Sequence, residues 1–173
     1  FHVSDSYFVV AHFHFMLMGA GLFGAIAAIS YWFPKMTGRM LNERIGSIGF
    51  WTAFAGFQIT FMSMFVAGLQ GQPRRVLQFD SMFNISNWIS TIGAYTIGIG
   101  MLIFLSAIIS SWRSGEVASS NPWHAQTLDW QTQTPVPLEN FPVLPVVTKL
   151  PYDYGVPEPR DPKVLEKQYD EKV

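Results

Sequence analysis

The sequence predicts an all-α membrane protein. It has three transmembrane helices that form part of a larger helical bundle, followed by an extended, proline-rich C-terminal tail. Two observations carry this prediction. Three long apolar runs contain no Lys, Arg, Asp or Glu, and most of the charge lies behind them. Residues 1–112 hold eight charged side chains, whereas residues 113–173 hold fifteen, together with nine of the eleven prolines.

The three spans run from about residue 7 to 33, from 45 to 69 and from 83 to 112. Each exceeds the ~20 residues that a helix needs to cross a hydrocarbon layer of ~30 Å. A single run of this kind could be the buried helix of a soluble protein. Three in succession indicate insertion into a membrane.

Small and aromatic residues are placed as membrane helices require. Ala20, Gly24 and Ala28 recur at helical spacing in the first span, which predicts a face for close packing against another helix. Aromatic side chains gather near the ends of the spans, as is typical of interfacial anchors. They are Tyr31, Trp32, Phe33, Trp51, Trp88 and Trp112.

The loops predict the orientation in a membrane, which we take to be the bacterial cytoplasmic membrane. Positive charge favours the cytoplasmic side, and by a narrow margin it places the first loop and the tail there. The N-terminal end and the second loop then face outward. The first loop carries Lys35, Arg39 and Arg44, the third span is followed by Arg113, and the second loop carries Arg74 and Arg75.

The tail, residues 113–173, is predicted to be a polar, cytoplasmic segment. Residues 121–147 mix prolines with aromatics, which indicates an extended stretch held against a partner surface. His124 is expected at the surface. From Tyr152 onward the composition is typical of solvated, disordered chain.

Composition excludes several function classes. A net charge of −1 without a basic cluster argues against a nucleic-acid partner. The absence of cysteine excludes disulfides and thiolate metal sites. The chain starts at Phe1 and shows no signal-peptide pattern. We interpret it as the C-terminal piece of a longer protein.

Two histidines stand in the oily stretch "VVAHFHFMLM", residues 9–18. On a helix, His12 and His14 lie ~200° apart, so they cannot share one metal ion. Each ring needs its own partner on its own side, and two haems flanking the helix, each with an axial histidine, would provide them. Two other readings stay open: hydrogen bonding to a neighbouring helix, and a proton relay.

The second loop, "GQPRRVLQ" at residues 71–78, places adjacent arginines on the outer side. A solvated or snorkelling pair is the plain explanation. However, Arg74 and Arg75 lie toward the same membrane face as the two histidines in this topology. Guanidinium groups suit the carboxylates of haem propionates at a water–membrane boundary.

Taken together, "DSYFVVAHFHF", "PRR" and "NPW…TLDW" resemble the last three helices and the tail of subunit I of haem–copper terminal oxidases. The resemblance implies that His12 is the catalytic-centre ligand, on the high-spin haem beside copper. It implies that His14 ligates the low-spin haem, and that Arg74 and Arg75 bind haem propionates.

Two departures from the family pattern stand out. The family usually has His-Asp before this helix, contributing to a magnesium or manganese site, whereas this chain has Ser4-Asp5. Asp5 is the candidate ligand that remains, since hard cations favour carboxylate oxygen. The family's "GMPRR" is "GQPRR" here, and the sequence offers no account of Gln72.

The resemblance implies a cytochrome c oxidase, which reduces dioxygen to water and translocates protons. It implies two haems of the A type, with copper in the parent subunit held by residues outside this chain. The implied partners are the rest of subunit I, other subunits including the copper-carrying subunit II, cytochrome c and the lipid bilayer.

Three alternatives stay open. A quinol oxidase of the same superfamily shares these motifs, although Asp5 and Pro73 favour cytochrome c as the donor. A non-enzymatic membrane scaffold would use the histidines for packing. A proton-coupled transporter would usually place further acids or bases inside its spans, and these spans contain none.

Overall fold

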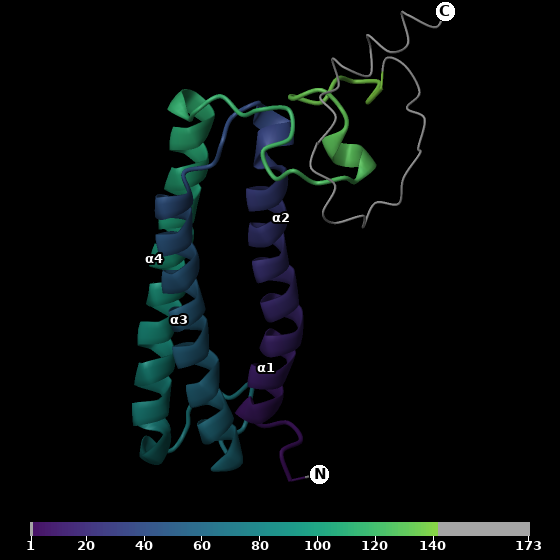
Figure 1. The fold of residues 1–173 in the computed structure, drawn as a ribbon. Helices are drawn as coiled ribbons and strands as arrows, with labels where there is room; N and C mark the ends of the chain where they lie inside the picture. The colour runs from purple at the N-terminus through teal and green to yellow at the C-terminus, as the bar shows by residue number, and fades with distance from the viewer. Residues whose placement is uncertain (1, 142–173) are drawn as a thin grey trace, which may run out of the picture. The chain divides into compact units, whose positions relative to one another are not determined.

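The computed structural model describes residues 2–141, and this part of the chain is helical, as predicted (Figure 1). Extended backbone pairs there only in two isolated bridges, Ser6–Pro73 and Arg39–Val117. The elements are α1 (Tyr7–Phe13), the π-helix η1 (His14–Gly19), α2 (Ala20–Thr37), α3 (Glu43–Leu69), the 3-10 helix η2 (Ser81–Phe83), α4 (Asn84–Ser114) and the 3-10 helix η3 (Leu128–Trp130).

Three continuous helical stretches are long and apolar enough to cross a membrane, which confirms the predicted number of spans. They are Tyr7–Thr37, Glu43–Leu69 and Ser81–Ser114. The first was expected to end before Pro34, but the helix continues past this proline to Thr37. A proline in the last turn removes only one backbone hydrogen bond, and the Thr37 hydroxyl donates to the Phe33 carbonyl at 2.8 Å.

Each helical stretch begins at a polar residue whose side chain accepts a hydrogen bond from a nearby backbone N–H. Ser6 caps α1 at 3.2 Å, Asn42 caps α3 at 3.1 Å and Asp80 caps η2 at 3.0 Å. These are residue types preferred at helix N-termini because they satisfy an otherwise unpaired donor. The caps fix where the loops end, including the loop that carries the two arginines.

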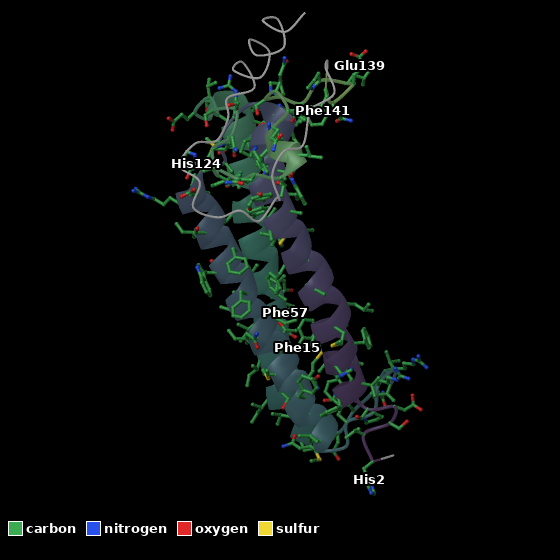
Figure 2. The ribbon with its side chains drawn as sticks, turned by 45° about the vertical axis from the view of Figure 1, so that its right-hand side comes forward. His2, Phe15, Phe57, His124, Glu139 and Phe141 are labelled. Atoms are coloured by element: carbon green, nitrogen blue, oxygen red, sulfur yellow. The ribbon has the colours of Figure 1, made fainter. Side chains whose placement is uncertain are left out.

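The described residues form two compact units, one of residues 2–30 and 42–109 and the other of residues 31–41 and 110–141. In the first unit, α1 and η1 pack against α3. Phe15 and Phe57 meet in this contact with ring centroids 4.8 Å apart (Figure 2). The buried centre consists of Ala11, Phe57 and Phe61, surrounded by Phe15, Met18, Phe23, Met64, Phe65 and Ile97.

Helices α3 and α4 approach so closely that their contact has no room for a side chain at four glycines, Gly49, Gly56, Gly93 and Gly100. A Cβ added at Gly56 would lie 2.6 Å from the Ile97 nitrogen, and one at Gly93 would lie 2.6 Å from the Thr60 nitrogen. Beside them, the Ser90 hydroxyl donates to the Thr60 carbonyl at 3.1 Å. Small residues and hydroxyl groups of this kind hold membrane helices together.

The small-residue face predicted in the first span is not where this packing occurs. Gly24 is exposed, and a Cβ added there would meet nothing within 4 Å in the described part of the chain. Spacing alone marked Ala20, Gly24 and Ala28 as a candidate face. Close packing of another helix on this face stays a prediction.

In the second unit, the tail folds against the end of α2. The Lys35 ammonium is buried, donates to the Thr132 carbonyl at 2.6 Å and lies 5.3 Å from the centre of the Trp130 ring. The Trp123 indole donates to the Tyr31 carbonyl at 2.9 Å. Over residues 121–141 the surface contacted is therefore that of the same chain. The disorder predicted from Tyr152 onward lies outside the described residues.

Candidate functional site

His14 is the first residue of η1, and its ring is held on three sides. Its Nδ1 lies 2.8 Å from the Val10 carbonyl oxygen. Because a carbonyl only accepts, this contact places a proton on Nδ1 and leaves Nε2 as the ring nitrogen that can bind a metal. The ring also stacks on Phe13 and Phe61, with centroids 4.5 Å apart in both cases. The imidazole thus has a fixed tautomer and a fixed plane.

His12, two residues earlier in α1, has different surroundings. Its side chain is exposed, and nothing among the described residues hydrogen-bonds its ring nitrogens. Ala11 beside it is fully buried. The described residues do not gather three His, Cys, Asp or Glu side chains around one point. The two imidazoles are therefore separate potential ligands rather than parts of one metal cluster.

The π-helix at His14–Gly19 was not predicted, because the spacing argument assumed a regular α-helix. Such segments contain an extra residue in the turn and are frequent at functional sites. Here the α-helix changes to a π-helix between the two histidines, since α1 ends at Phe13. We find no residue pattern in this stretch that signals the change.

The N-terminal segment and the second loop are joined by a pair of charges. Arg74 donates from Nη2 at 2.6 Å and from Nε at 3.0 Å to the same Asp5 oxygen, Oδ1. The Arg74 backbone N–H also donates to the Asp5 carbonyl at 3.0 Å. Ser6 and Pro73 form the bridge next to this pair, and Figure 1 shows the loop after α3 passing beside the start of α1.

Arg75 differs from its neighbour. It is exposed, and within residues 2–141 its guanidinium forms no ion pair. Its φ of 64° lies in the left-handed region, which costs a non-glycine residue roughly 1–3 kcal/mol. The contacts of Arg74 with Asp5 lie directly before this residue in the loop. The sequence pointed to both arginines but could not show that one is paired and the other available.

Gln72, a residue of this loop for which the sequence offered no account, is fully buried. Its Nε2 donates to Asn87 Oδ1 at 3.2 Å, and Asn87 Nδ2 returns a bond to Gln72 Oε1 at 3.4 Å. Asn87 Nδ2 also donates to the Phe83 carbonyl at 3.0 Å. The Gln72 backbone accepts from the Tyr7 N–H and donates to the Ala67 carbonyl, both at 3.0 Å.

The donor set fits haem better than it fits a divalent cation. A neutral imidazole with a free nitrogen is an axial ligand for haem iron, and an available guanidinium suits a carboxylate. At Asp5, by contrast, one carboxylate oxygen is engaged by Arg74, and the described residues bring no set of three ligands together. Residues 2–141 do not make a Mg²⁺ or Mn²⁺ site by themselves, and Asp5 as a ligand stays a prediction.

Comparison with known proteins adds an independent finding. The family described as Cytochrome C and Quinol oxidase polypeptide I matches residues 1–96. This stretch contains the first two helical stretches and the start of the third. It also contains every candidate residue of the site: Asp5, His12, His14, Arg74 and Arg75.

Curated relatives extend the match into the tail. Cytochrome c oxidase subunit 1 of Thermostichus vulcanus is 50% identical over 155 residues, covering 90% of this chain and 28% of the relative. The Synechocystis sp. protein of the same name is 45% identical with the same coverage. That of Corynebacterium efficiens is 44% identical over 149 residues, covering 84% of this chain and 26% of the relative.

The chain thus spans 28% of the length of the first two relatives. This confirms the resemblance to subunit I of haem–copper terminal oxidases, as a part of that subunit. Together with three helices that meet the requirements for spanning a membrane, it makes the chain part of an integral membrane protein. Because the family match covers residues 1–96 of 173, the chain belongs to the cytochrome c and quinol oxidase polypeptide I family.

Proposed function

We propose that this chain supplies one axial histidine to each of two haems in a respiratory terminal oxidase. The complete enzyme would reduce dioxygen to water with electrons from cytochrome c and couple this reaction to proton translocation. The observation that carries the proposal is the histidine pair. His14 is fixed through Nδ1 with Nε2 available, while His12, two residues away, is exposed and hydrogen-bonded to nothing in residues 2–141.

In this proposal His14 would hold the low-spin haem, and His12 would hold the high-spin haem beside copper. When bound, the haems supply electron transfer and the oxygen-binding iron. The Val10 carbonyl, by accepting from Nδ1 of His14, orients the ring and raises the basicity of Nε2. His12 and His14 belong to one continuous helical stretch, which keeps the two ligands at a fixed separation.

The arginines would compensate the negative charge of haem propionates. Arg75 is available for this, and Arg74 is oriented by Asp5. A positive charge near a haem favours its reduced form. We therefore expect Arg74→Gln or Arg75→Gln to lower a haem midpoint potential, measured by spectroelectrochemical titration of the complete complex. Unchanged potentials in both variants would contradict this role.

The remaining parts of the enzyme would lie outside this chain. The haems would be of the A type, copper would be held by other residues of subunit I, and any Mg²⁺ or Mn²⁺ at Asp5 would take further ligands from elsewhere. The partners would be the rest of subunit I, other subunits including the copper-carrying subunit II, and cytochrome c. In a bacterial cytoplasmic membrane the arginine loop would face outward and the tail inward.

The electron donor can be tested with the purified complex. We expect oxygen consumption with reduced cytochrome c and little with a ubiquinol analogue, because the three relatives described above are named for cytochrome c. His14→Ala should abolish oxygen consumption, and His124→Ala, a change of an exposed tail histidine, should not. Oxygen uptake with quinol but not with cytochrome c would contradict cytochrome c as the electron donor and favour the quinol oxidases of the family.

A further inference from the structure

We infer that Gln72 is a positioning residue: through its amide pair with Asn87 it holds the arginine loop in place, and thereby sets the haem potentials. This inference rests on the proposed role of Arg75, since Arg74 is held separately by Asp5. It concerns a residue for which neither the motif nor the family resemblance supplies a function.

Gln72 connects the loop to all three helical stretches of its unit. Its backbone N–H donates to the Ala67 carbonyl near the end of α3, and its carbonyl accepts from Tyr7, the first residue of α1, both at 3.0 Å. Its side chain pairs with Asn87 in the first turn of α4. Gln72, two positions before Arg74, therefore connects the loop to the start of α1, the helix that contains His12.

The burial of this pair makes its geometry specific. Gln72 is 0% exposed, so its amide cannot turn to water when Asn87 is removed. A buried polar group without a partner is strongly unfavourable, so the loop would have to move to satisfy the amide. Arg75, three residues on with its φ of 64°, depends on the same backbone. A shift of the loop would move its charge.

The alternative is that Gln72 only contributes to folding. The two readings differ in what happens when Arg75 is absent. If Gln72 acts through the arginine charge, replacing it changes a haem potential only while Arg75 is present. If it only stabilises the fold, any change in potential is independent of Arg75. A double-mutant cycle separates these readings.

The experiment uses the complete oxidase complex and compares Gln72→Leu, Arg75→Gln and the double variant by redox titration. The matched control is Gln78→Leu, the same chemical change at an exposed position of the same loop. We expect Gln72→Leu to lower a haem midpoint potential with haem content unchanged, and Gln78→Leu to leave it unchanged. In the Arg75→Gln background, Gln72→Leu should cause no further shift.

The exchange variant, Gln72→Asn with Asn87→Gln, restores an amide pair and should return the potential toward that of the wild type. If Gln72→Leu does not assemble, Gln72→Met with Asn87→Leu takes its place in the cycle, because that double variant leaves no amide buried without a partner.

Two results would overturn the inference, and they are distinguishable. A lowered potential in Arg75→Gln with none in Gln72→Leu, or a Gln72→Leu shift that persists in full without Arg75, refutes the positioning role and leaves the proposed function standing. Unchanged potential in Arg75→Gln itself removes the arginine role on which the inference rests.

Discussion

At the scale of single residues, the site depends on which polar groups are already paired. Two nitrogens of Arg74 donate to one oxygen of Asp5, at 2.6 and 3.0 Å, whereas Arg75 has no ionic partner in residues 2–141. The sequence pointed to the two arginines from their type and their side of the membrane, and to Asp5 through the family resemblance. It could not show the pairing, because Asp5 and Arg74 are far apart in the chain and only the folded backbone brings them together.

Asp5→Asn tests this pairing. The change removes a negative charge next to Arg74, so we expect a haem midpoint potential to rise, the opposite of the effect of removing an arginine. The free energy of unfolding should change by no more than about 1 kcal/mol, because the Asp5 side chain is 74% exposed and that of Arg74 is 23% exposed. Redox titration and thermal denaturation of the complex measure the two effects, and a lowered potential would contradict the account.

Gln72 shows where residue-level reasoning from sequence reached its limit. A buried glutamine needs partners, and its position in a loop motif gave no hint that it was buried or that Asn87 would face it. The relevant signal, a polar residue at a position where the resembling family carries methionine, was visible. Its meaning required the three-dimensional contact.

At the scale of elements, the three spans followed directly from the length of the apolar runs. The predicted ends of the spans differ from those of the helical stretches by only a few residues. The π-helix at His14–Gly19 did not follow, since no spacing of residue types distinguishes it from an α-helix here. The packing faces were also not predictable. Small residues occur on every span, and only the contact between α3 and α4 selects Gly56 and Gly93.

Gly93→Ala tests the importance of that contact. The added methyl would collide with the backbone and hydroxyl of Thr60, so we expect destabilisation of about 1–3 kcal/mol from overpacking. Gly98→Ala is the matched control on the same helix, because a Cβ there meets nothing within 4 Å. Thermal denaturation of the complex should show a lower midpoint for Gly93→Ala alone. Equal midpoints for the two variants would refute the close packing.

At the scale of the whole molecule, much of the described surface is apolar. Large side chains such as Trp88 (69% exposed) and Leu102 (66% exposed) lie open on α4. Extended apolar surface of this kind is covered in the native state by lipid or by protein. This agrees with a chain that spans only 28% of the length of its relatives. The remaining haem and copper ligands are predicted on helices outside this chain, so its sequence does not contain them.

In the second unit, the contact between Lys35 and the tail can be tested separately. Lys35→Met keeps the unbranched side chain up to Cε and removes the ammonium that donates to the Thr132 and Gln133 carbonyls. We expect faster limited proteolysis within residues 115–141 and unchanged haem spectra, because cleavage follows the population of the opened tail. Arg113→Met, a change of an exposed cation, serves as the control. Equal cleavage rates for Lys35→Met and the wild type would show that the lysine does not hold the tail.

The central claim is that His12 and His14 bind two different haems. The most direct test is the reduced-minus-oxidised visible spectrum of the purified complete complex, with and without carbon monoxide. We predict two haem signals, of which carbon monoxide shifts one. His12→Ala should lose the shifted signal and His14→Ala the other. A complex without haem absorbance, or loss of the same signal in both variants, would contradict the claim.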